Sequence, residues 1–264
     1  MDTLRPDTAA RLTALVAEVR AAAEPIEGTA EVQVLVTVVA GAPAEHLVQL
    51  SEGAGLLVVG SRGRGGVRST LLGSVALHCG TSAACPVVVV HPAIATPSLP
   101  PGAVASSPRV VVGLDDSDAA QAALIRAVDL ADEMDAEVEA VVAVQLPVYW
   151  GESAVVVPVP FAQLREQALA RARERVAELP AGSRVPVRVL AADGPAGAVL
   201  VERSADAALL VVGSRGRSRL PGMLLGFVAL HCVVHAPCPV MVVHLPVTRG
   251  RRSTATPAAV AFVG

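Results

Sequence analysis

The sequence predicts an α/β protein with a doubly wound parallel sheet, built as two tandem copies of which the first is incomplete. Three observations lead to this prediction. Strand-like valine runs alternate along the chain with segments of helical periodicity. The apolar runs are continuous, as in strands buried on both faces, and a composition of 53% hydrophobic but only 2% aromatic residues means cores of Val, Ala and Leu. One half of the chain also repeats part of the other.

The repeat is found by adding 153 to a residue number in the first half, which pairs Gly60 with Gly213. Between residues 41 and 91 this makes 29 of 51 positions identical, a clear duplication signal. The second copy has a further strand–helix–strand unit, residues 109–144, that the first copy lacks. The expected organisation is a shortened domain at 1–92, a Pro-rich linker at 93–108, a complete domain at 109–246 and a tail at 247–264.

In the first half, apolar residues at three- and four-residue spacing, such as Leu12, Leu15 and Val19, predict an opening helix. Runs rich in β-branched residues predict the strands. The expected elements are helix 6–23, strand Val32–Val38, helix Ala44–Gly53, strand Leu56–Val59, helix Ser74–Ala84 and strand Val87–Val90.

The second half begins with a strand that ends in Asp115-Asp-Ser-Asp118, and later repeats the order of the first half. A Pro-rich loop carries Tyr149 and Trp150. The expected elements are strand Arg109–Leu114, helix Ala119–Met134, strand Glu137–Val144, helix Phe161–Leu179, strand Val185–Ala191, helix Ala196–Ser204, strand Leu209–Val212, helix Val228–His235 and strand Val240–Val243.

Composition excludes several function classes. A net charge of −3 offers no basic excess for a nucleic-acid partner. The chain contains no lysine, which excludes a Schiff base and a P-loop lysine. Its four cysteines recur as two equivalent pairs, which indicates positions set by the fold and not a secreted disulfide scaffold. No apolar run approaches the ~18 residues that span a bilayer, and the first residues lack a signal-peptide pattern, so we expect a cytoplasmic protein without a membrane partner.

Each copy places a Gly/Arg loop between a strand and a helix, an arrangement that presents backbone N–H groups and a helix dipole to an anion. The loops lack the lysine of a Walker A motif, and Arg68 stands where a dinucleotide-binding fingerprint needs a third glycine. What remains is the pattern Gly-x2-Gly-x9-Gly-Ser. It is formed by Gly60, Gly63, Gly73 and Ser74 in the first copy, and by Gly213, Gly216 and Gly226, followed by Phe227, in the second.

This pattern, together with Val-Val-Val-Gly-Leu-Asp-Asp-Ser at 110–117 and Cys-Pro-Val-Val-Val-Val at 85–90, resembles the universal stress protein (UspA-like) family. The chain looks like a tandem-domain member with a shortened first domain. The resemblance implies the adenine nucleotide alpha hydrolase-like, Rossmann-like form of the doubly wound fold. It also implies a cofactor, ATP or another adenine nucleotide, with Mg²⁺ as an optional companion, and a role in stress adaptation.

The same resemblance assigns roles to individual residues. Asp115 would contact the adenosine part, Gly113 and Ser117 would shape the same edge, and the apolar strand end from Val142 to Val144 would flank the adenine. The phosphates would lie against Gly60, Arg62, Gly63, Arg64, Gly73, Ser74 and Val75 in the first copy, and against Gly213, Arg215, Gly216, Arg217, Gly226, Phe227 and Val228 in the second.

Each copy departs from the family pattern differently. In the second copy Phe227 removes a hydroxyl and adds bulk, and Pro221 removes an N–H donor, so both would weaken phosphate binding. The first copy keeps Ser74 but has no strand to supply a counterpart of Asp115.

No catalytic residues are expected, because Asp115 and Asp116 also suit a helix N-terminus. Slow ATP hydrolysis is left open. So is a second hypothesis, a structural or oligomerisation scaffold that binds no nucleotide. His78, Cys79, Cys85 and His91 match no zinc-ligand spacing, so we expect buried core residues and no metal.

The last strand of each copy, Val87–Val90 and Val240–Val243, is expected to be an edge strand that can pair across a domain or subunit interface. The family uses this edge for dimers. The resemblance therefore implies an intramolecular pseudo-dimer or a homodimer through these strands.

Overall fold

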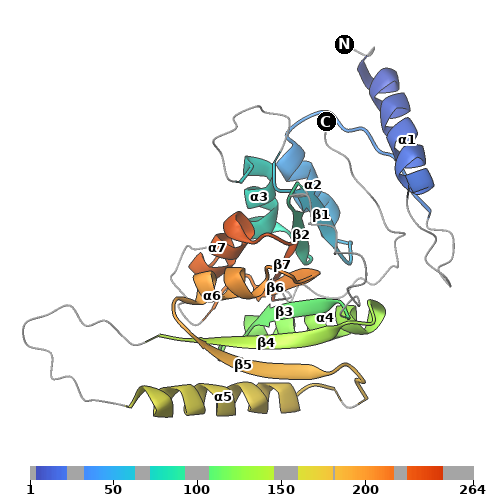
Figure 1. Ribbon diagram of the computed structural model, residues 1–264. Helices are drawn as coiled ribbons and strands as arrows, with labels where there is room; N and C mark the ends of the chain where they lie inside the picture. Colours follow the sequence, from blue (N-terminus) through green and yellow to red (C-terminus); the bar gives the residue numbers. More distant parts are fainter. Residues whose placement is uncertain are drawn as a thin grey trace, which may run out of the picture.

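The computed structural model describes residues 4–22, 33–62, 72–92, 107–145, 160–180, 182–216 and 225–245 (Figure 1). The helices are α1 (Leu4–Ala22), α2 (Pro43–Ser51), α3 (Ser74–Ser82), α4 (Asp118–Glu133), α5 (Phe161–Ala177), α6 (Ala196–Arg203) and α7 (Phe227–His235). The strands are β1 (Leu57–Gly60), β2 (Val87–Val90), β3 (Arg109–Gly113), β4 (Glu137–Val144), β5 (Val187–Asp193), β6 (Leu209–Gly213) and β7 (Val240–Val243).

The seven strands of the described residues form one sheet in the order β1-β2-β7-β6-β3-β4-β5. Neighbouring strands are parallel except β2 and β7, which pair antiparallel with Val88 opposite Met241. The two copies therefore share a continuous sheet and meet at their last strands. This is the pairing expected for these strands, and it occurs within the chain.

Helices cover both faces of the sheet, which confirms the doubly wound fold class. Side chains alternate between the faces along each strand. Val111 is fully buried in a core that includes residues of α2, α3, α6 and α7. Its neighbour Val112 is fully buried on the opposite face, in a core that includes residues of α4 and α5. Strands with both faces covered explain why the valine runs lack a polar alternation.

The strand order changes direction between β3 and β6, which lie side by side although 95 residues separate Gly113 from Leu209. The chain leaves β3 through α4 on one face, whereas α6 precedes β6 on the other. In open α/β sheets such a switch point opens a crevice at the carboxyl ends of the strands. Gly113 and Gly213 are the last residues of β3 and β6 and mark this place.

The expected strand Val32–Val38 is wrong in its described part, because residues 33–40 contain no strand and Leu35 is 62% exposed. The internal repeat gives the reason. Its second-copy counterpart is β5, whose residues from Val187 to Asp193 pair with β4. Among the described residues the first copy has no counterpart of β4, so residues 34–40 have no strand beside them there to satisfy their backbone groups.

Helix α1 was expected and is present, but its apolar side chains stay outside the core. Leu15 and Val19 are 41% and 56% exposed, and Figure 1 shows α1 apart from the sheet. Its counterpart α5 packs against β4 and β5. The missing strands of the first copy thus explain both the exposed helix and the lost strand.

The other expected helices and strands are confirmed, with ends that differ by one or two residues. The Pro-rich loop with Tyr149 and Trp150, residues 93–106 of the linker and the tail 247–264 lie outside the described residues. The domain boundaries stay a prediction. Within the described part of the chain, no helix is both long and apolar enough to cross a membrane.

Candidate functional site

The Gly/Arg loop of the second copy is closed at its base by two backbone hydrogen bonds. Ser214 N–H donates to Val243 O at 2.8 Å, which ties the end of β6 to β7. Gly226 N–H then donates to Ser214 O at 2.7 Å, so the chain returns to the point from which it left. Gly226 is the N-cap of α7 and has no side chain with which to cap it. The first N–H groups of α7 are thus left to other partners.

The first copy closes its loop in the same way. Ser61 N–H donates to Val90 O at 2.7 Å, and Gly73 N–H donates to Ser61 O at 2.8 Å. Gly73 is the N-cap of α3, as Gly226 is of α7. The repeated sequence therefore produces the same loop base twice.

A cavity of about 260 Å³ lies at the carboxyl ends of β3 and β6, at the switch point of the sheet. It lies within the second copy and brings together residues from six segments: the end of β3, the start of α4, β4, α6, the end of β6 and the start of α7. Nine of the predicted site residues line it: Gly113, Asp115, Ser117, Gly213, Arg215, Gly216, Gly226, Phe227 and Val228.

Two glycines allow the backbone to approach closely at this cavity. A Cβ at Gly213 would lie 2.8 Å from the backbone carbonyl of Ala119, so β6 could not end against the start of α4 with any larger residue. A Cβ at Gly216 would lie 2.7 Å from Asp115 Oδ2. The loop after β6 therefore rests directly against the carboxylate that follows β3.

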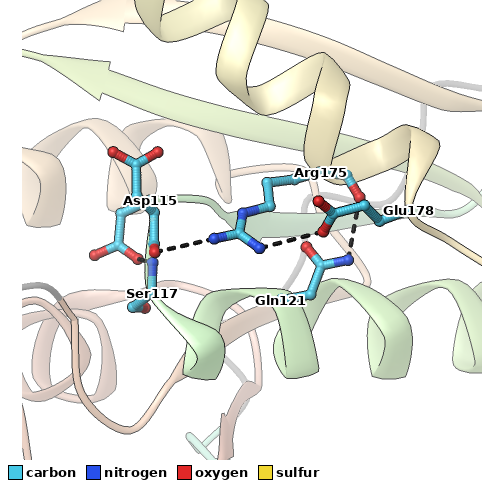
Figure 2. Close-up of polar contacts among 6 residues, drawn as sticks. Asp115, Ser117, Gln121, Arg175 and Glu178 are labelled. Carbon is cyan, nitrogen blue, oxygen red and sulfur yellow. Dashed lines mark hydrogen bonds and ion pairs between the residues drawn. The ribbon is translucent and has the colours of Figure 1, made fainter.

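The Asp115 carboxylate is held by its own turn (Figure 2). Ser117 N–H donates to Asp115 Oδ1 at 2.9 Å. Ser117 in turn caps α4, because its Oγ accepts from Ala120 N–H at 3.2 Å. The Asp and Ser residues serve the helix N-terminus as expected, and the same turn presents Asp115 to the cavity.

The remaining wall is apolar, and only Ala143 of it was expected from the sequence, as part of the strand end from Val142 to Val144. The residues of this wall are Leu114, Ala120, Val141, Ala143, Ala196, Leu200, Val212 and Ala229. Val142, which was expected at the adenine, does not line the cavity and packs toward the α4 and α5 side of the sheet. Side chains alternate between the two faces of β4, so the neighbours of Val142, which are Val141 and Ala143, face the cavity instead. The i, i+4 spacing of Ala196 and Leu200 was a usable signal.

Arg215 brings positive charge to the cavity. It also lines a smaller adjoining cavity of about 90 Å³, together with Ser117, Ala119, Gly216 and Leu245. His244 lies close enough for the guanidinium to affect its titration. Burial lowers the pKa of His244, the charge of Arg215 lowers it further, and hydrogen bonds with the backbone of Gly80 and Cys85 oppose this. Arg215 is therefore placed to attract an anion, while His244 stays neutral at pH 7.

In the first copy, Gly60, Arg62, Gly73, Ser74 and Val75 lie around the end of β1 and the start of α3. Ser74 begins α3 and is exposed. The structure does not bring these residues to the cavity that Asp115 lines. Three predicted phosphate residues, Gly63, Arg64 and Arg217, lie outside the described residues, as do Arg68 and Pro221.

The repeated cysteines are core residues, as expected. Cys79 and Cys85 are buried and free. Burial, with the neighbouring cysteine, raises the pKa of Cys79 to about 11 and that of Cys232 to about 12, so these thiols are protonated at neutral pH. The expectation is wrong for His78, which lies exposed on the outer side of α3. Across the described ranges, no three His, Cys, Asp or Glu residues group in a way that could hold a metal ion.

Comparison with known proteins agrees with this architecture. A model of the Universal stress protein family matches residues 2–91 and 107–244, and the chain therefore belongs to this family. Universal stress protein Rv2005c of Mycobacterium tuberculosis is 36% identical over 227 residues, covering 83% of this chain and 71% of that protein. Universal stress protein Rv2623 of the same organism is 36% identical over 214 residues, covering 78% and 66% respectively.

Solved structures show the same fold. A universal stress protein from Archaeoglobus fulgidus matches with a TM-score of 0.56 at 24% identity, covering 90% of this chain and 79% of that one. A putative universal stress protein from Pseudomonas aeruginosa matches with a TM-score of 0.57 at 20% identity, covering 91% and 79%.

Proposed function

We propose that this universal stress protein is a cytoplasmic adenine-nucleotide-binding protein that acts in stress adaptation without catalysis of its own. The proposal assigns one ATP, or another adenine nucleotide, to the cavity between β3 and β6. The observation that carries it is the convergence of nine predicted residues on that cavity.

The phosphate end of the cavity has the chemistry that an anion needs. Gly213 and Gly216 add no side chains of their own at this end, and Arg215 contributes a cation. Gly226 places the start of α7 at the same wall, where unsatisfied N–H groups and the helix dipole favour negative charge. These residues would bind phosphate oxygens mainly through backbone N–H groups.

The opposite end suits a nucleoside. Val141, Ala143 and Leu200 form an apolar wall on which a base can lie. Asp115 provides a carboxylate that can accept hydrogen bonds from ribose hydroxyls or an exocyclic amine. Asp115 is also the sole carboxylate among the described residues of the lining. Any Mg²⁺ bound with the nucleotide would therefore be held chiefly by phosphates and water.

Titration calorimetry with ATP tests this function. The wild-type chain should bind ATP, and Gly216→Ala should bind it about ten-fold more weakly, because the new Cβ displaces the Asp115 carboxylate. Gly55→Ala is the matched control, since nothing lies within 4 Å of a Cβ at that position, and it should bind as the wild type does. Absence of binding by the wild-type chain at millimolar ATP would instead favour the scaffold hypothesis.

A further inference from the structure

The turn that carries Asp115 is held from outside by helix α5. Asp116 lies between Asp115 and Ser117, and α5 contacts it twice. Arg175 Nη2 donates to the Asp116 carbonyl at 3.2 Å, and Arg171 Nε forms an ion pair with Asp116 Oδ1 at 3.5 Å. The two arginines are one helical turn apart, so they reach the same turn from one side of α5.

Arg175 is itself fixed at two other points, as Figure 2 shows. Its Nη1 donates to Glu178 Oε2 at 3.2 Å, which orients the plane of the guanidinium. Its backbone carbonyl accepts from Gln121 Nε2 at 3.1 Å, and Gln121 lies in the first turns of α4. Arg175 thus links α5 to both the turn before α4 and α4 itself.

Helix α5 is also anchored to the sheet. Arg165 Nη1 donates to Asp193 Oδ1 at 3.1 Å, and its Nη2 donates to Ala191 O at 2.9 Å. Ala168 and Ala172 are buried beneath the helix. Because α5 cannot slide along β5 without breaking these contacts, the two arginines hold the Asp116 turn from a fixed support.

Neither arginine is needed to fill the core. The Arg175 and Arg171 side chains are 28% and 52% exposed. The repeat places Glu18 and Ala22 at the corresponding positions of the first copy, which has no counterpart of the Asp115 turn. Arginines therefore occur at these two positions in the copy that has the turn and the cavity, and not in the other copy.

We infer that Arg175, assisted by Arg171, is a positioning residue for the nucleoside end of the site, acting on Asp115 through the backbone and carboxylate of Asp116. The inference rests on the proposed function, since Asp115 is the group that would contact the nucleoside. It implies that α5 influences affinity for adenosine without touching the ligand.

The test compares adenosine and tripolyphosphate as ligands of the full-length chain, by calorimetry. Arg175→Ala should weaken adenosine and ATP binding about five- to ten-fold, the effect of losing a hydrogen bond or two, and leave tripolyphosphate within two-fold. Arg175→Lys should show most of the same loss, because one ammonium cannot reach both Asp116 O and Glu178 as the guanidinium fork does. Arg171→Ala should have a smaller effect.

Arg173→Ala is the matched control, because Arg173 lies exposed on the same helix and its removal changes the net charge equally. It should leave all three ligands unaffected. A loss for adenosine and tripolyphosphate alike in Arg175→Ala would overturn the inference, since it would indicate a general charge effect. Unchanged adenosine affinity in Arg175→Ala would overturn it as well.

Amide hydrogen exchange gives a readout without ligand. The Ser117 N–H, which donates to Asp115 Oδ1, should exchange several-fold faster in Arg175→Ala than in the wild type or Arg173→Ala. If the wild-type chain binds no nucleotide, the proposed function fails, and this experiment still decides whether α5 holds the turn. An unchanged Ser117 exchange rate would then refute the positioning role.

Discussion

Phe227 is the residue at which the second site differs most clearly from the first. It begins α7, lines the cavity and is 69% exposed, whereas Ser74 occupies the equivalent position at the start of α3. A serine hydroxyl there can donate to a phosphate oxygen, and a phenyl ring cannot. The ring also occupies space beside the N–H groups that start the helix.

Phe227→Ser should therefore strengthen ATP binding by about three- to ten-fold, the contribution of one hydrogen bond. Because the ring is mostly exposed, its removal should leave folding stability nearly unchanged. Calorimetry measures the affinity, and Phe227→Ala separates the gain from added space from the gain due to the hydroxyl. Weaker binding in both variants would show that the ring itself contacts the nucleotide.

Most of the polar and glycine residues that line the cavity were expected from the sequence, since they carry a recognisable spacing. The sequence did not predict the contact of Gly216 with Asp115, which joins residues 101 positions apart. Val142, which was expected at the adenine, does not line the cavity. A strand buried on both faces shows no polar alternation from which to tell which side chains face the cavity.

At the level of secondary-structure elements, the two copies differ in what covers their strands. Val211 of β6 is fully buried in the core beneath α4. Val58 of β1 occupies the equivalent place and is 53% exposed, because no helix of the described first-half residues covers it as α4 covers Val211. The same residue type therefore contributes differently to stability at two equivalent positions.

Val211→Ala should lower the free energy of unfolding by about 2 kcal/mol, through lost transfer energy and a residual cavity. Val58→Ala should change it by less than about 0.5 kcal/mol. Chemical denaturation followed by circular dichroism measures both. Equal losses in the two variants would mean that β1 is covered in solution as β6 is.

The prediction of strands succeeded where a neighbouring strand is present to pair with, and failed for residues 33–40. Local sequence there favours a strand as strongly as it does in β5. What β5 has in addition is β4 alongside it, from Val138 to Val144. Strand formation depends on this long-range pairing, which a local pattern cannot reveal.

At the scale of the whole molecule, the two copies exchange equivalent contacts across the β2–β7 junction. His91 Nε2 lies 2.8 Å from Val233 O, and His244 Nε2 lies 2.9 Å from Gly80 O. Adding 153 to His91 gives His244, and adding 153 to Gly80 gives Val233, so each contact is the repeat equivalent of the other. This reciprocity is the property of a two-fold interface. Since β2 and β7 both lie inside the sheet, neither leaves an edge for a second chain.

The reciprocal contact predicts an acid-sensitive junction. His244 must donate from Nε2 to Gly80 O, and its Nδ1 is buried. Burial lowers the pKa of His244 in the folded chain. The unfolded chain therefore binds a proton more readily, so stability falls as the pH drops below about 6.5.

Unfolding by denaturant at pH 7.5 and pH 5 should show this loss in the wild type, and a smaller loss in His244→Gln, whose amide can still donate to Gly80 O. His231→Gln is the control, because His231 is exposed on α7. An equal pH dependence in wild type and His244→Gln would contradict the assignment.

The proposed nucleotide lies between β3 and β6 in the second copy. Amide hydrogen exchange with and without saturating ATP tests this most directly. We expect slower exchange at residues 113–117, 213–216 and 225–229, which border the cavity. Protection confined to residues 60–62 and 73–75 of the first copy, or no protection anywhere, would contradict the claim.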